Sequence, residues 1–266
     1  MSFQPVIPQT GYVGWRFLQR TLDTQQATFN DSVPVKRATD HFREKIGSIR
    51  TAEDLVKDRD LLSVALGAFG LDDDINNTYF IKKILSDGTT SPEALSNRLS
   101  DKRYAAFARE FGFGEGDLSR TGLSFFADKI TGLYETKQFE RAVGDQDNDL
   151  RSALNLSNGL GEIIAEAGSN DARWFTIMGN PPVRAVFETA LGLPRSLARL
   201  DIDQQLDNFK TRARSILGTD QVGDLATPEQ EEKLVRLFLI RSEANAATTS
   251  AGSVALTLLQ NAPRFY

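Results

Sequence analysis

Apolar residues recur at helical spacing over most of the chain, and the segment from Asp201 to Leu217 is the clearest instance. Its apolar positions lie three or four residues apart and therefore share one face of a helix. They are Ile202, Leu206, Phe209, Ala213 and Ile216. Acidic residues stand at the start of this segment and Gly218 follows its end, as in a capped helix. Convincing strand alternation is absent, so the pattern predicts an all-α protein.

A short pattern that ends in glycine occurs four times. Each copy holds two apolar positions four residues apart, on one helical face, and then a glycine. The copies are Ala65–Gly70, Phe107–Gly112, Phe139–Gly144 and Phe187–Gly192. Because glycine tolerates the left-handed backbone that closes many helices, we predict that each copy ends a helix. The copies are unevenly spaced, which argues against a fixed-period solenoid and favours a multi-helix bundle of related short helical hairpins.

The same signals divide the chain into three parts. Residues 1–11 carry two prolines and predict an extended lead-in. Residues 12–243 form the all-helical region, either as one domain or as two subdomains that meet near residues 114–120. Residues 244–266 predict a flexible tail with an apolar patch. The helices are expected at about residues 14–30, 35–46, 51–69, 72–86, 91–99, 101–112, 121–134, 136–144, 149–157, 160–167, 171–178, 182–191, 201–217 and from 228 onward.

Composition limits the possible functions. The chain has 266 residues, a formal net charge of −5 and no cysteine. A mildly acidic surface argues against broad binding to nucleic acid, and the missing thiols exclude disulfides, thiolate catalysis and cysteine-bound metals. No stretch approaches the ~18 apolar residues of a membrane span, and the N-terminus does not resemble a cleavable signal peptide. We therefore expect a soluble protein without membrane insertion.

Acidic clusters are the first candidates for chemistry. Asp145–Asp149 resembles the first half of a calcium loop, but Leu150 and Leu156 stand where that loop needs Gly and Glu. An acidic turn that caps the next helix explains it better. Asp72–Asp74 also precedes an apolar helical run, so helix capping is favoured over paired-carboxylate catalysis. An enzyme that uses either cluster remains the alternative.

The other candidates also have structural explanations. His41 is the only histidine, and a surface or boundary position suits it better than a catalytic triad. The glycines of 112–116 and of 159–161 predict turns, because neither segment has the strand and the Lys-Ser/Thr of a phosphate loop. Trp174–Met178 predicts a core segment, with a ligand pocket as the alternative. We therefore expect no catalytic residue, no cofactor and no metal site.

Several motifs together resemble the DUF1217 family, a domain of unknown function found mainly in alphaproteobacteria. The motifs are Gly11-Tyr-Val-Gly-Trp-Arg-Phe-Leu18, Asp58-Arg-Asp-Leu-Leu62 leading into 65–71, Asp72–Asn77, Phe80-Ile-Lys-Lys-Ile-Leu85, Asp101-Lys-Arg-Tyr104 with Phe111-Gly-Phe113, Gln138–Gly144, and Ala190-Leu-Gly-Leu-Pro194. The likeness spans about residues 11–243. It implies an all-helical protein and carries over no catalytic residue.

Many members of this family are encoded among flagellar genes, so the resemblance implies a role in flagellar assembly or motility. We expect a non-enzymatic protein that binds a protein partner, with a flagellar component as the candidate. Its candidate contact residues are Val254, Leu256, Leu258 and Leu259. The protein would stay in the cytoplasm, or it would be exported through the flagellar secretion route, which uses uncleaved N-termini. A small-ligand-binding helical protein is the remaining alternative.

Overall fold

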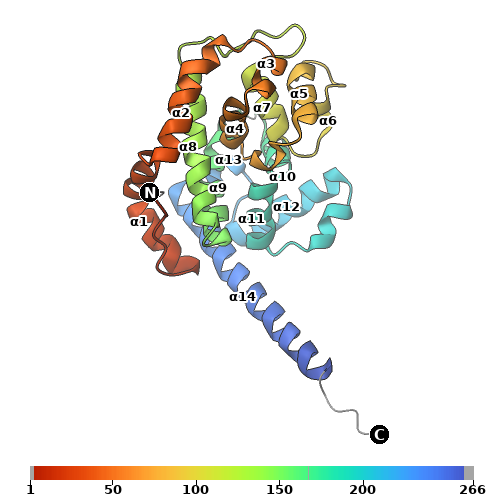
Figure 1. Cartoon of the computed structure of the whole chain (residues 1–266). Coiled ribbons are helices and arrows are strands. Elements are labelled where there is room, and N and C mark those ends of the chain that lie inside the picture. Colours follow the sequence, from red (N-terminus) through yellow and green to blue (C-terminus); the bar gives the residue numbers. More distant parts are fainter. Residues whose placement is uncertain (1–2, 167, 261–266) are drawn as a thin grey trace. The chain divides into compact units, whose positions relative to one another are not determined.

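The computed structural model describes residues 3–166 and 168–260, without the side chains of residues 162, 166, 195 and 248–260. Every regular element in these ranges is helical, which confirms the predicted all-α class (Figure 1). The described chain forms two compact units, and α1 (Gly11–Asn30) and α9 (Asn148–Glu166) each contribute to both. The division within α9 falls between Arg151 and Ser152, and residues 114–120 lie inside the first unit.

The first unit contains most of α1, the start of α9 and the elements between them. These are α2 (Val33–Lys45), η1 (Ile46–Ser48), α3 (Ala52–Lys57), α4 (Arg59–Ala68), η2 (Asp72–Asp74), α5 (Thr78–Asp87), α6 (Leu95–Arg98), α7 (Arg103–Phe111) and α8 (Phe126–Gly144). Helix α4 is the centre of this unit, because it packs against α2, α3 and α8. Beside it, Phe111 makes edge-on ring contacts with Phe107 and Phe126, and all three side chains are fully buried.

The second unit contains the rest of α9 and the first turns of α1. Its other elements are α10 (Asn170–Met178) and α11 (Pro181–Leu191), apart from residues 178–181, and η3 (Arg195–Arg199), α12 (Ile202–Leu217), α13 (Val222–Leu225) and α14 (Pro228–Gln260). Trp174 is fully buried and packs against the rings of Phe187 and Phe209. The hydroxyl of Tyr12 donates to Glu232 Oε1 at 2.5 Å, which fastens the start of α1 to α14.

Each of the four glycine-terminated copies ends a helix, as predicted, and the left-handed backbone is found in three of them. Gly70, Gly112 and Gly192 have φ angles of 65°, 64° and 63°, in the left-handed region where a side chain would be strained. Gly144 differs, since it lies at the end of α8 without a positive φ. The side chain of Arg151 lies where a Cβ of residue 144 would be. Glycine is therefore suited to this position by the close approach of α9.

Several predicted boundaries were wrong. The helix expected at 51–69 is divided at Asp58 into α3 and α4, and the helix expected at 91–99 is the short α6. Residues 121–144 do not hold two helices, because no residue near Glu135 stops the continuous helix α8. Gly159 and Gly161 lie inside α9 instead of in a turn, and Val183 Cγ2 lies 3.4 Å from the position of a Cβ on Gly159. The helix expected at 72–86 begins only at Thr78, after the short η2. Residues 244–260, expected as a tail, continue the helix α14.

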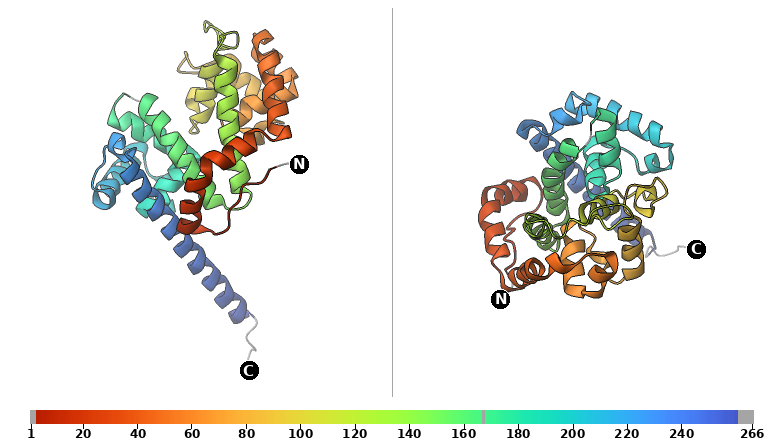
Figure 2. Two further views of the ribbon diagram at one scale, coloured as in Figure 1. Left: turned by 90° about the vertical axis from the view of Figure 1, so that its left-hand side faces the viewer. Right: turned by 90° about the horizontal axis from the view of Figure 1, so that it is seen from above.

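Helix α14 extends beyond the other described elements of its own unit. Figure 1 and the left view of Figure 2 show its C-terminal half running on with no described element of that unit beside it. Its N-terminal half is buried through Leu234, Val235, Phe238 and Leu239. No helix in the part of the chain that the structure describes combines the length and the apolar character needed to cross a membrane.

Candidate functional site

His41 lies beside a helix cap. Its Nε2 is 3.6 Å from Asp58 Oδ2, and about a third of each side chain is exposed. Asp58 Oδ1 accepts hydrogen bonds from the backbone N–H groups of Asp60 and Leu61, both at 3.0 Å, and so caps α4. The boundary position predicted for His41 is confirmed.

The carboxylates of the Asp72–Asp74 cluster bind neighbouring elements. Asp72 Oδ1 accepts a hydrogen bond from Gln138 at 2.7 Å and forms an ion pair with Arg141 at 3.0 Å, both on α8. Asp74 Oδ2 accepts from the hydroxyl of Tyr104 at 2.6 Å. These contacts hold η2 against α7 and α8. They differ from the helix capping predicted for this cluster, because the segment is a 3-10 turn ahead of α5.

A pocket of about 310 Å³ lies beside this cluster in the first unit. It is lined by Arg59, Asp60, Ser63, Leu66, Asp72, Ile75 and Arg141. Two guanidinium groups and a hydroxyl suit an anion, but two carboxylates face the same space. Arg59 donates to Asn76 at 3.1 Å, and Arg141 pairs with Asp72. The charges that line this pocket therefore balance one another.

The Asp145–Asp149 cluster caps α9, as predicted. Asp147 Oδ1 accepts hydrogen bonds from the backbone N–H groups of Asp149 and Leu150 at 2.9 and 3.0 Å. Gln146 Nε2 donates to the carbonyl of Pro5 at 2.7 Å. Among the described residues, no group of three or more His, Cys, Asp or Glu side chains is placed to hold a metal ion.

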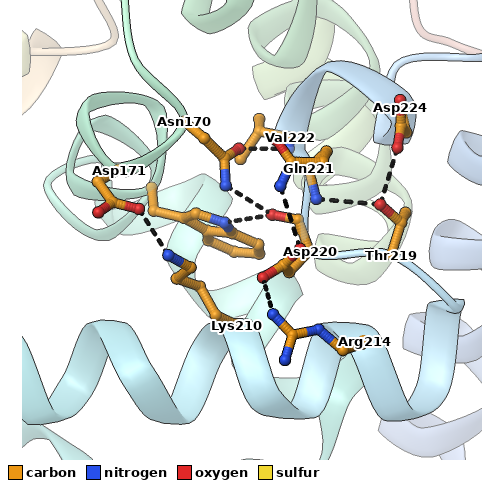
Figure 3. A network of polar contacts seen from close by, with 10 residues as sticks. Asn170, Asp171, Lys210, Arg214, Thr219, Asp220, Gln221, Val222 and Asp224 are labelled. Atoms are coloured by element: carbon orange, nitrogen blue, oxygen red, sulfur yellow. Dashed lines mark hydrogen bonds and ion pairs between the residues drawn. The ribbon is translucent and has the colours of Figure 1, made fainter.

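Trp174–Met178 is a core segment, as predicted, with residues 174–177 in the second unit and Met178 in the first. Trp174 and Ile177 are fully buried, whereas Phe175 is 37% exposed. The indole Nε1 of Trp174 donates to the carbonyl of Asp220 at 2.8 Å, and this bond belongs to the polar network in Figure 3.

This network fixes the turn between α12 and α13. Asn170 bonds twice across it, with Nδ2 donating to the carbonyl of Asp220 at 2.9 Å and Oδ1 accepting from the N–H of Val222 at 2.8 Å (Figure 3). Arg214 pairs with the Asp220 carboxylate. Burial by itself would raise the pKa of the Asp220 carboxyl. The hydrogen bonds from Arg214 and Gln221 outweigh this effect, so the pKa is lowered. The network has a structural role. Its polar groups form hydrogen bonds with one another, and these bonds fix the backbone of the turn that leads into α13.

A larger groove lies between the end of α11 and α14. It encloses about 610 Å³ and is lined by Ala185, Glu188, Thr189, Gly192, Leu193, Arg241, Ala244 and Asn245. Arg241 Nη1 donates to the carbonyl of Ala190 at 2.6 Å, and Arg212 Nε donates to that of Leu191 at 3.2 Å. These arginines satisfy carbonyls at the C-terminus of α11. Most of the remaining lining consists of small side chains, which leave the groove open.

Helix α14 is exposed beside and beyond the residues that line the groove. Ile240 is 52% exposed, and residues 243–247 are all exposed. The backbone of Val254, Leu256, Leu258 and Leu259 belongs to α14, but their side chains lie outside the described residues. Sequence reasoning identified this apolar segment and missed the groove, because only the fold brings 185–193 beside 241–245.

Comparisons with known proteins give the family. A family model described as "Protein of unknown function (DUF1217)" matches residues 68–230, which is more than half of the chain. The crystal structure of protein AGR_C_984 from Agrobacterium tumefaciens is similar, with a TM-score of 0.71 and 27% sequence identity. The similarity covers 90% of this chain and 98% of that one. No curated protein matches significantly. The chain thus belongs to the DUF1217 family.

Proposed function

We propose that this protein is a non-enzymatic component of flagellar assembly or motility, and that it acts by binding a protein partner through the C-terminal half of α14. The observation that carries the proposal is the extension of α14 beyond the core of its unit. The C-terminal half of such a helix is stabilised little by packing against its own chain. A binding partner would supply the missing packing contacts.

The composition of this segment supports a buried role. From Ala244 to Pro263 the sequence contains no ionisable side chain. Exposed helices ordinarily carry charged residues on their solvent face. Three threonines, two serines and Gly252 also lower the intrinsic helix propensity, and isolated helices of this length are marginal in water. Packing against a partner would stabilise the helix and cover Val254, Leu256, Leu258 and Leu259.

The flagellar part of the proposal comes from the family. Many members are encoded among flagellar genes, which associates the family with this organelle without giving a mechanism. Two locations are compatible with it. The protein would act in the cytoplasm as a chaperone or scaffold, or it would leave the cell through the flagellar channel.

Deleting the gene in the native host tests the proposal. We expect fewer or shorter flagellar filaments by electron microscopy and a smaller swimming zone in soft agar, with both restored by the wild-type gene on a plasmid. Immunoblots of cells and culture supernatant distinguish the two locations. A deletion strain with normal filaments and normal swimming would contradict the flagellar role.

A further inference from the structure

The last four carbonyl groups of α11 are all hydrogen-bonded, two of them to arginine side chains. A helix leaves these four groups without partners inside the helix. The first two accept N–H groups of the turn that follows α11, from Leu193 at 2.8 Å and from Gly192 at 3.1 Å. The last two accept from Arg241 and Arg212, at 2.6 and 3.2 Å. The backbone of α11 therefore holds both guanidinium groups in place.

These contacts bring the two guanidinium groups close together beside the groove. Arg241 Nη1 lies 2.8 Å and Arg212 Nη2 lies 3.4 Å from the position of a Cβ on Gly192, which lines the groove. Each guanidinium has five N–H donors, and the α11 carbonyls accept from one donor of each. Among the described residues, neither arginine forms an ion pair with a carboxylate. Two positive charges are therefore concentrated at this end of the groove.

The acidic residue that lines the groove does not neutralise these charges. Glu188 Oε1 accepts from Arg184 Nε at 2.7 Å, one turn earlier on α11, and this ion pair balances its charge. Arg212 and Arg241 thus leave the groove locally positive on a chain whose net charge is −5. A confined positive site of this kind favours a short anionic group. The acidic remainder of the protein would repel a long polyanion such as nucleic acid.

The other residues of the groove suit a peptide better than an inorganic anion. The volume of about 610 Å³ is typical of clefts that bind organic ligands and is far larger than an inorganic anion needs. Ala185 on α11 and Ala244 on α14 are small, so a peptide backbone can approach both helices closely. Thr189 and Asn245 line the same space with groups that form hydrogen bonds with peptide groups.

We infer that the groove binds an acidic peptide segment of the partner protein, with a carboxylate held by Arg212 and Arg241. The planar guanidinium group suits this role because it can donate to both oxygens of a carboxylate. The inference rests on the proposed function in that it takes the protein to bind a partner through α14, whose residues 241, 244 and 245 line the groove. It adds the chemistry of that partner.

Fluorescence anisotropy with the full chain and labelled peptides tests the inference. The probe is a decapeptide of alternating Ala and Glu, and its control carries Gln in place of every Glu. We expect saturable binding of the Glu peptide. The dissociation constant of the Gln peptide should be higher by about tenfold or more, because an amide lacks the charge-assisted hydrogen bonds of a carboxylate. A third peptide, with phosphoserine in place of Glu, distinguishes a phosphate site from a carboxylate site.

Variants of the arginines locate the binding. Arg241→Gln should weaken binding of the Glu peptide by about tenfold or more, while the glutamine keeps an N–H donor for the α11 carbonyl. Arg241→Lys keeps the charge without the planar fork and should give an intermediate loss. Arg236→Gln is the matched control, since it removes the same charge from an exposed position of α14 outside the groove. Circular dichroism checks that the variants retain the helical fold, and the comparison of Glu and Gln peptides needs no variant.

The outcomes separate this inference from the proposed function. No saturable binding of the Glu peptide, equal affinity for the Glu and Gln peptides, or an equal loss in Arg236→Gln would overturn the inference. Binding of the phosphoserine peptide without binding of the Glu peptide would also overturn it and would assign the site to a phosphorylated partner. A flagellar defect in the deletion strain would still support the proposed function with a different contact. Conversely, the expected peptide binding together with a normally motile deletion strain would support the inference and contradict the flagellar role.

Discussion

The indole Nε1 of Trp174 on α10 donates a hydrogen bond to the backbone carbonyl of Asp220 at 2.8 Å. The two residues are 46 positions apart in the sequence, and their bond lies inside the second unit. We predict that Trp174→Phe lowers the free energy of unfolding by about 1–3 kcal/mol, because it removes a buried hydrogen bond and part of a packed ring. Urea denaturation measures the change. Phe175→Leu, at the exposed neighbouring position, should change stability by less than about 0.5 kcal/mol.

Two glycines of α8 should respond oppositely to alanine. No heavy atom lies within 4 Å of the position of a Cβ on Gly132, whereas the Arg151 side chain occupies that position at Gly144. We expect Gly132→Ala to raise the free energy of unfolding by about 0.5–1 kcal/mol through helix propensity. Gly144→Ala should give no gain or a loss, because Arg151 must move. Thermal melts of both variants decide this, and an equal gain at both positions would contradict the packing described for α9.

Tyr104 should make stability depend on alkaline pH. Burial raises the pKa of Tyr104 above the ordinary 10.0, and its hydrogen bond to Asp74 raises it further. The folded state therefore holds the phenolic proton more tightly than the unfolded state. The stability that this group contributes is fully present below pH ~10 and is lost as the pH rises above that value.

The variant Tyr104→Phe isolates this contribution. At pH 8 we expect it to be less stable than the wild type by about 0.5–1.5 kcal/mol, the usual net value of one hydrogen bond. The difference should shrink in urea melts between pH 10 and pH 11. Tyr79→Phe serves as the control, since the Tyr79 side chain is 81% exposed. A difference that stays constant or grows across this range would contradict the assignment.

Glu135 is a place where removing a charge should stabilise the fold. Burial raises the pKa of the Glu135 carboxyl, although the nearby Arg43 opposes the shift. Asn30 Nδ2 donates to Glu135 Oε2 at 3.2 Å, while the buried Asn30 Oδ1 has no hydrogen-bond partner. A glutamine would keep the acceptor and supply a donor for that oxygen.

We therefore expect Glu135→Gln to raise the free energy of unfolding at pH 7 by about 0.5–1.5 kcal/mol. Because the pKa is raised, the charged carboxylate destabilises the wild-type fold more as the pH rises. The stability advantage of Glu135→Gln should therefore diminish towards pH 4. Chemical denaturation at pH 4 and pH 7 measures it. Glu135→Ala, which removes the acceptor, should destabilise the protein, and a glutamine variant that is less stable at pH 7 would refute this prediction.

Much of the fold could be predicted from local sequence, because helix ends depend on local chemistry. Threonine is a common N-cap residue, and the hydroxyl of Thr51 accepts a hydrogen bond from the N–H of Asp54 at 3.1 Å at the start of α3. The left-handed cap expected at Gly144 and the turn expected at Gly159 were wrong because both glycines have tertiary reasons: each makes room for a side chain from another helix. In the sequence, a glycine that ends a helix cannot be distinguished from a glycine that makes room for a side chain of another helix.

The candidate site divides in the same way. The uncharged C-terminal segment was visible in the sequence, since composition is local information. Its helical continuation and the groove were not, because the groove requires α11 and α14 to lie side by side. The one sequence feature that pointed to the groove was Gly192. Its predicted left-handed φ turns the chain beside Arg241, whose Nη1 lies 2.8 Å from the position of a Cβ on this glycine.

The most direct test of the account is the swimming-zone diameter of a gene-deletion strain that carries either of two full-length variants at wild-type expression. Leu258→Glu places a charge at one of the four proposed contact residues of α14, and Ser253→Glu places the same charge at a position outside that set. We predict that Ser253→Glu restores swimming and that Leu258→Glu does not. Equal restoration of swimming by both variants would contradict the claim that the protein acts through this helix.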